Sequence, residues 1–161
     1  MKKIILSLFL ILPLSKLYSL EVACNFEEVY LNGEIQQGFF LLDNKNLRYQ
    51  YYDERLFTII STKNNYFLIN NFDKNVQKIN ENTEFFDNLM EIANNYPDIQ
   101  DNYFLDDSNI MIEKSHTNFI KRISIKSSNL NVSINFFNCR FESYHKKYFK
   151  HFDFEEFFLS D

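Results

Sequence analysis

The spacing of the turns constrains the fold of this chain more than any other feature of its sequence. From Glu21 onward, short runs rich in Phe, Tyr, Ile and Val recur roughly every ten residues, which is typical of successive antiparallel hairpins. The clearest turn is Asn32-Gly33, because Asn-Gly supplies the positive φ angles of a type I′ turn. Six strands are therefore expected over residues 21–80, with further turns at 43–46, 53–54, 63–65 and 73–75.

The period of the apolar residues changes after residue 82. Spacings of three and four residues predict one amphipathic helix there. Either Asn82 or Thr83 could accept hydrogen bonds from its first amides, and it should end near Asn94-Asn95 because Pro97 follows closely. The apolar residues of this helix are Phe85, Phe86, Leu89, Met90, Ile92 and Ala93. Strands are expected again at about 103–105, 109–114, 118–126 and 129–141.

These elements predict a mainly β fold. A meander of about ten strands does not lie flat, because strand twist curls it. The apolar stripe of the helix must also be buried against another element. We expect an antiparallel meander curled into an incomplete β-barrel, a half-barrel, covered by one central amphipathic helix, in a single domain over residues 20–161. Its aromatic inner face would either line a ligand cavity or form a solid core.

The first 19 residues resemble a targeting segment rather than part of the folded domain. Lys2 and Lys3 precede an apolar run from Ile4 to Leu14, and small and polar residues follow, as in a secretory signal peptide. A membrane helix needs about 20 apolar residues, which this run does not reach. We expect a signal peptide over residues 1–19 with cleavage after Ser19; the alternative is a retained anchor.

Export would place the two cysteines, Cys24 and Cys139, in an oxidising compartment. An even number of thiols in an oxidising compartment tends to pair. We expect a structural disulfide that joins the two ends of the domain, and the alternative is two buried free thiols. A redox pair would more often have its cysteines two residues apart.

Composition and motifs argue against several classes of function. With 22 Asp and Glu against 17 Lys and Arg, the chain lacks the basic excess of a nucleic-acid binder. Two glycines, Gly33 and Gly38, cannot build a phosphate-binding loop, and no G-x-S-x-G motif is present. The three histidines have no metal-ligand spacing, so no metal is expected. They are His116, His145 and His151.

Two further groups of charged residues have simple explanations. The pairs Asp106-Asp107 and Glu155-Glu156 are poor catalytic dyads, because adjacent residues on a strand point to opposite faces. We therefore expect a protein that is not an enzyme and has no cofactor. Tyr148 and Phe149 lie among three lysines, Lys146, Lys147 and Lys150. This basic and aromatic segment is either a patch that contacts a partner or an anionic membrane surface, or a solvated edge of the fold.

Several apolar segments occur in a recognisable order, at 38–42, 46–52, 57–61, 66–71, 120–125 and 148–154. Their order resembles that of the LolA-like family of periplasmic outer-membrane lipoprotein carriers. The resemblance covers about residues 26–155 and depends on order and spacing more than on any one motif. The sequence departs from the family at Asp43-Asn44-Lys45, where the family has a basic residue followed by Pro, and in lacking a long amphipathic N-terminal helix.

This resemblance implies a half-barrel with a helical lid whose apolar concavity shelters the acyl chains of lipoproteins crossing the periplasm. It implies a monomer whose partners are acylated lipoprotein or lipid cargo and membrane-bound loading and receiving complexes. The alternative is a non-catalytic envelope protein with the same fold and a filled core. Such a protein would bind a partner through its sheet edge or through residues 146–150.

Alternation predicts which side chains face the concavity. Leu47, Tyr49 and Tyr51 share one face of their strand and should point inward, opposite Arg48 and Gln50. On the fifth strand we expect Phe67 and Ile69 to point inward, although Tyr66 and Leu68 are equally apolar. The remaining expected ligand-binding residues are Phe40, Leu42, Phe57 and Ile59 on strands and Phe86, Leu89 and Met90 on the helical lid.

Overall fold

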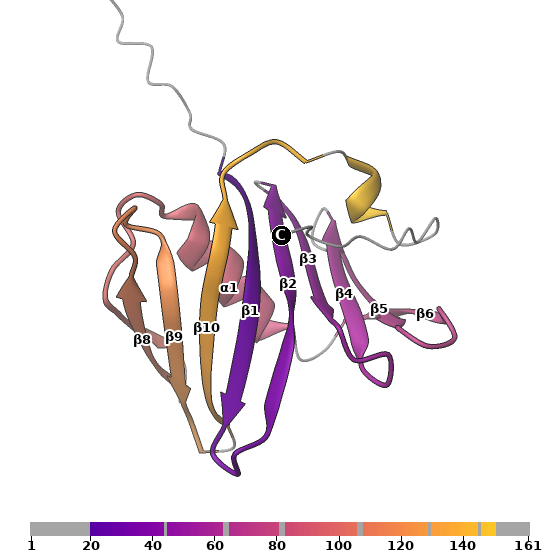
Figure 1. Ribbon diagram of the computed structural model, residues 1–161, viewed down its shortest axis with the longest axis horizontal. Helices are drawn as coiled ribbons and strands as arrows, with labels where there is room; N and C mark the ends of the chain where they lie inside the picture. Colours follow the sequence, from indigo (N-terminus) through magenta and orange to yellow (C-terminus); the bar gives the residue numbers. More distant parts are fainter. Residues whose placement is uncertain are drawn as a thin grey trace, which may run out of the picture.

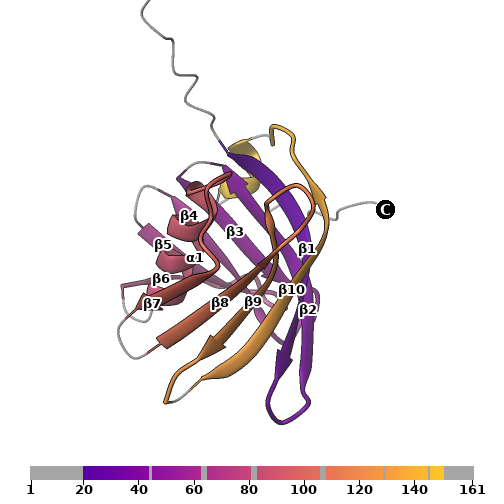
Figure 2. The same cartoon turned by 90° about the vertical axis from the view of Figure 1, so that its left-hand side faces the viewer.

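A computed structural model gives the fold of the chain (Figures 1 and 2). It describes residues 20–43, 45–62, 65–80, 83–105, 108–128, 130–144 and 146–150, apart from the side chains of Glu84 and Leu105. The predicted signal peptide, residues 1–19, lies outside the described residues, as do Asn82, the two acidic pairs, His145 and His151.

Ten strands, one α-helix and a short 3₁₀ helix make up the described structure. The first six strands are β1 (Glu21–Tyr30), β2 (Ile35–Asp43), β3 (Asn46–Tyr51), β4 (Phe57–Thr62), β5 (Asn65–Asn70) and β6 (Val76–Ile79). After them come α1 (Glu84–Asn94), β7 (Asn102–Leu105), β8 (Ser108–Lys114), β9 (Ile120–Lys126), β10 (Asn131–Arg140) and η1 (Lys146–Phe149). The strands and the helix begin and end close to the predicted positions.

All ten strands form one antiparallel sheet in the order β6-β5-β4-β3-β2-β1-β10-β9-β8-β7. The first and last strands of the chain, β1 and β10, pair at the centre of the sheet. β6 and β7 are its two edges, so the sheet curls without closing. The predicted fold class, an incomplete barrel with one central helix, is confirmed.

Helix α1 connects β6 to β7 and lies against the concave side of the curled sheet (Figure 2). Phe86, Leu89, Ile92 and Ala93 are buried along one stripe of the helix, as their three- and four-residue spacing predicts. The side chain of Thr83 makes no capping hydrogen bond to the helix amides. Its hydroxyl instead donates to Asp87 Oδ2 at 3.0 Å.

The first hairpin turn lies where Asn32-Gly33 predicts it, but it is not of type I′. Gly33 has a φ of 83°, whereas Asn32 is not among the described residues with positive φ. Tyr30 and Glu34 close the turn, with the Tyr30 amide donating to the Glu34 carbonyl at 3.0 Å. The loop therefore has one more residue than a type I′ hairpin, and only its last position needs glycine.

The sheet buries side chains on both faces. The main core lies on the concave face and includes side chains of α1. A second, smaller cluster on the convex face joins Ala23, Phe39 and Leu41 to Phe149 of η1. The return of the chain after β10 therefore covers part of the outer surface of β2, β3 and β4 (Figure 1).

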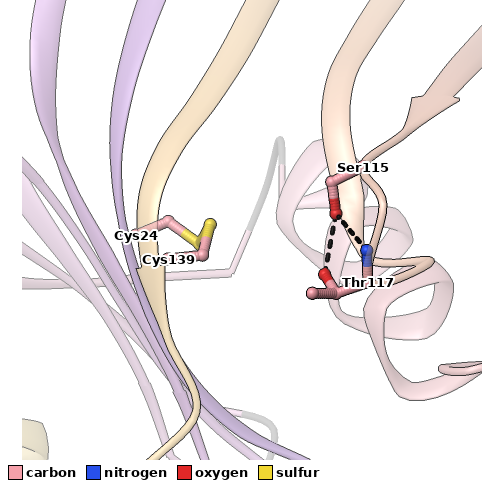
Figure 3. The surroundings of a disulfide bond; sticks show 4 residues. All are labelled: Cys24, Ser115, Thr117 and Cys139. Atoms are coloured by element: carbon pink, nitrogen blue, oxygen red, sulfur yellow. Dashed lines mark hydrogen bonds between the residues drawn. A yellow bond between two sulfur atoms is a disulfide. The ribbon is translucent and has the colours of Figure 1, made fainter.

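The predicted disulfide between Cys24 and Cys139 is confirmed. It joins β1 to β10, as Figure 3 shows. The pairing of these two strands has a register shift between Ala23 and Asn25, next to the bond. The turn containing Ser115 and Thr117, at the end of β8, lies in the same view. Since 115 residues separate the two cysteines, the bond fixes the central strand pair that the chain forms from its two ends.

Candidate functional site on the concave face

Most of the residues predicted to face the concavity lie there. The main core contains six of the strand residues and two of the helix residues from that prediction, and Phe57 and Met90 are half-buried against it. The eight core members are Phe40, Leu42, Leu47, Tyr49, Tyr51, Ile59, Phe86 and Leu89. The structure thus brings β2, β3, β4 and α1 together around one apolar surface.

The prediction for β5 is wrong: Phe67 and Ile69 point away from the concavity. Leu68 pairs with Ile59, which belongs to the concave core, and Ile69 pairs with Thr58 on the opposite face. Tyr66 and Leu68 therefore point inward. Both alternating sets of this strand are apolar, so only its pairing with β4 decides which set is inside.

Helix α1 is held to the sheet by aromatic packing and by a hydrogen bond. The ring of Phe86 lies 5.5 Å from that of Tyr49 and 6.4 Å from that of Tyr66. The Tyr66 hydroxyl donates to Asp87 Oδ1 at 2.5 Å. Burial, and then this hydrogen bond, raise the pKa of Tyr66, so it remains a donor at neutral pH. This bond latches α1 to β5.

The middle of the concave face is filled in this structure. Phe26, Phe40, Leu42, Leu47 and Tyr49 each have 0% of their surface exposed. A side chain without accessible surface borders neither solvent nor a void that could hold water. An acyl chain could therefore reach these residues only if α1 moved away or their side chains repacked.

A buried carboxylate lies on the same face, and the sequence analysis missed it. Glu28 of β1 is 3% exposed. Tyr30 donates to its Oε2 at 2.6 Å, Tyr49 donates to its Oε1 at 2.6 Å, and Tyr51 lies 3.0 Å from Oε2. The cluster joins β1 to β3 through hydroxyl donors. The available signal was the position of Glu28 in phase with Phe26 and Tyr30 on an otherwise apolar face.

The three tyrosines of this cluster resist ionisation. Burial raises the pKa of Tyr49 and Tyr51, and the charge of Glu28 raises both further. Burial and the hydrogen bond to Glu28 likewise raise the pKa of Tyr30. All three remain protonated at neutral pH, so the carboxylate has hydroxyl donors on both of its oxygens. The concave face thus combines a large apolar area with one buried polar group that is fully hydrogen-bonded.

Arg48 points away from the concavity, as predicted, but it is 1% exposed. Its Nε donates to Gln50 Oε1 at 3.0 Å and its Nη1 to the carbonyl of Tyr148 at 3.1 Å. The guanidinium also lies 5.5 Å from the centre of the Phe39 ring. Burial lowers its pKa to about 10. This side chain therefore attaches η1 to the convex face.

The basic segment 146–150 is partly docked on the sheet. Phe149 is buried and Tyr148 is half-buried, while Lys146 and Lys150 are exposed. The aromatic residues of the predicted patch thus pack inward, and two of its lysines point to solvent.

The described residues give little sign of other chemistry. Within them, no group of three or more His, Cys, Asp or Glu side chains is arranged to hold a metal ion. His116 is exposed in the turn between β8 and β9. In the part of the chain that the structure describes, no helix has the length and apolar character needed to cross a membrane.

Comparison with known proteins shows only distant likeness, and only in structure. No protein-family model and no curated protein sequence matches this chain. Its backbone is similar to the crystal structure of a LolA superfamily protein from Nitrosomonas europaea, with a TM-score of 0.44 and 10% sequence identity. The match covers 82% of this chain and 90% of that chain.

Proposed function

We propose that this protein is a non-enzymatic carrier that shelters the acyl chains of lipoproteins, or of other lipidated cargo, under α1. The observation that carries the proposal is an amphipathic helix laid over the apolar concave face of a sheet whose edges, β6 and β7, do not meet. In this proposal the exported protein works in the periplasm as a monomer. Membrane-bound complexes load it and receive its cargo toward the outer membrane.

The energetics of acyl chains require such a shelter. Each buried methylene is worth about 0.8 kcal/mol, so an acyl chain does not cross water unaided. A carrier must cover the chain and still release it. Displacing Phe86 and Leu89 of α1 from the sheet would expose an apolar surface, and the cargo would replace the contacts that the helix loses. Binding of the cargo and displacement of α1 from the sheet would then occur together.

The filled middle of the concave face favours a second candidate. If the interior does not open, the protein is a structural or interaction protein of the envelope with the same fold. Its contacts would then use an edge strand, such as β6 with its exposed Val76, or the exposed lysines Lys146 and Lys150. The two candidates differ in whether α1 can leave the sheet.

The substitution Tyr66→Phe tests this difference. It removes the hydroxyl that latches α1 through Asp87 and leaves the ring in place. Loss of a hydrogen bond worth about 1 kcal/mol would increase the open population about fivefold. A carrier should therefore lose thermal stability and yet bind a fluorescent fatty-acid probe about fivefold more tightly, since apparent affinity scales with the competent fraction.

Tyr103→Phe is the matched control. It removes a hydroxyl that accepts a hydrogen bond from the Gln100 amide at 3.1 Å, away from the latch, and should leave probe affinity unchanged. Polar substitution at Met90, Met90→Ser, should weaken probe binding more than it weakens folding. If neither the unaltered protein nor Tyr66→Phe binds the probe, the carrier proposal fails and the filled-core interaction protein is favoured.

A further inference from the structure

Among the residues that the structure describes, most of the exposed large apolar side chains lie at one end of the sheet. Because neighbouring strands are antiparallel, the turns β1–β2, β3–β4, β5–β6, β7–β8 and β9–β10 all lie at the same end. At or beside each of these turns is at least one exposed apolar residue, and together they form what we call the apolar rim. Its members are Leu31, Ile35, Tyr52, Phe72, Phe104 and Leu130.

The exposures on the apolar rim are high for such residues. Leu31 is 82% exposed, and Phe72 and Phe104 are each 78% exposed. Most of the surface of these side chains is therefore open to solvent. Burying them elsewhere would be favourable in proportion to that area.

The opposite end of the sheet is different. Its turns carry polar residues, such as exposed Lys45 between β2 and β3 and exposed His116 and Asn118 between β8 and β9. Phe119 in the latter turn is buried. Phe141 is 43% exposed there, but its ring lies 5.4 Å from that of Phe119 and belongs to an aromatic cluster. Most of the large exposed apolar side chains thus lie at the rim end, whereas Met111 and Phe137 are exposed along β8 and β10.

Two of the turns that carry the apolar rim extend furthest from the body of the sheet. Figure 1 places the β1–β2 and β9–β10 turns at the far end of the sheet, and residues of both turns line one groove. This open groove of about 550 Å³ lies between them, with Tyr30, Leu31 and Leu130 among its lining residues. Leu31, Ile35 and Leu130 therefore make a paired apolar tip.

The arrangement suits a lipid surface better than a protein surface. The rim side chains stand on separate turns among exposed polar residues such as Asn32, Glu34 and Asp73, so they make no continuous patch. A protein interface buries its apolar core as one packed area. The interfacial region of a bilayer accepts apolar and aromatic side chains one at a time, with polar neighbours remaining in the headgroups.

The charged side chains near the rim indicate which class of lipid the rim would bind. Acidic and basic residues near the tips are mixed, with Glu34, Asp73 and Glu54 exposed beside Lys74 and Lys126. A surface drawn to anionic lipids carries a cluster of Lys and Arg, with each one contributing about 1 kcal/mol. Contact at this rim should therefore depend on apolar insertion and not on lipid charge.

We propose that the apolar rim is a membrane-docking surface that inserts Leu31, Ile35 and Leu130 into the interfacial region of a lipid bilayer. The inference does not depend on the carrier proposal, because it uses the outside of the sheet end and not the face under α1. A protein with a filled core could dock in the same way.

Sedimentation with protein-free phosphatidylcholine vesicles tests the proposal. The combined substitution Leu31→Ser, Ile35→Ser and Leu130→Ser should lower the partition coefficient about tenfold or more, which corresponds to about 1.4 kcal/mol. Phe137→Ser is the control, because Phe137 is 44% exposed on β10, away from the rim. Adding phosphatidylglycerol to the vesicles should change the binding of the unaltered protein little.

Thermal melts should show all variants folded, since the substituted side chains are exposed. The proposal is overturned if the unaltered protein does not bind phosphatidylcholine vesicles, if it binds only anionic ones, or if the triple variant binds as well as the control. The triple variant should retain its affinity for the fatty-acid probe in vesicle-free solution. If the unaltered protein binds the vesicles but not the probe, the carrier proposal fails and the docking surface stands.

Discussion

Removing one hydroxyl from the buried Glu28 cluster should cost far more than removing a similar hydroxyl at the surface. In Tyr49→Phe the ring can keep its stacking on Phe26, with 4.1 Å between ring centres. The change removes the 2.6 Å hydrogen bond to Glu28 Oε1 and leaves that oxygen with Tyr51 at 3.1 Å. Packing is nearly unchanged, so the effect isolates the polar interaction.

The magnitude follows from the charge and burial of the acceptor. Hydrogen bonds to charged groups contribute about 1.5–3 kcal/mol, and the buried Glu28 carboxylate cannot replace the lost Tyr49 donor with water. Tyr49→Phe should therefore lower the free energy of unfolding by about 1.5–3 kcal/mol. With a urea dependence of about 2 kcal/mol per molar, the unfolding midpoint should fall by about 1 M.

Urea unfolding followed by circular dichroism measures this, with Tyr52→Phe as the matched control. Tyr52 is 44% exposed, and its hydroxyl donates to Asn25 Oδ1 at 2.9 Å, a bond that water can replace. The control should cost less than about 0.5 kcal/mol. In a double-mutant cycle with Glu28→Gln, the coupling should be about 0.5–3 kcal/mol. Equal midpoints for Tyr49→Phe and Tyr52→Phe, or zero coupling, would refute the reasoning.

Two further predictions concern the whole fold. Alkaline pH should unfold the protein, because the folded-state pKa values of Tyr49 and Tyr51 lie above the unfolded value of 10.0. Above about pH 10 these two tyrosines alone give the folded state two more protons than the unfolded state, and the raised pKa values of Tyr30 and Tyr66 act in the same direction. Arg48, whose pKa is lowered to about 10, offsets one of these protons. Stability should then fall by at least about 1.4 kcal/mol per pH unit, with tyrosinate absorbance rising together with the loss of circular dichroism; tyrosinate appearing in the intact fold would contradict this. Cys24→Ala with Cys139→Ala should lower stability by about 4–5 kcal/mol, because the bond closes a loop across 115 residues; dithiothreitol should destabilise the unaltered protein but not this variant, and an unchanged unfolding midpoint on reduction would count against it.

The sequence alone determined the local elements and their order. Strand and turn positions follow from alternation and spacing, and the span of α1 follows from its apolar stripe and Pro97. In β3 the inward set was readable, because Arg48 and Gln50 alternate with Leu47, Tyr49 and Tyr51. These features depend on the geometry of a single strand or helix, which is set by neighbouring residues.

Only the tertiary structure decided what depends on two distant segments meeting. Pairing with β4 turned Tyr66 inward and Phe67 outward, since β5 offers apolar residues on both faces. The return of the chain to the convex face buried Arg48, a residue whose type alone would place it in water. Glu28 became a buried site only because β3 brings Tyr49 and Tyr51 to β1, across β2, in a sheet whose order the local sequence does not specify. Local periodicity decides which side chains share a face, whereas strand order and register decide which side chains that face meets.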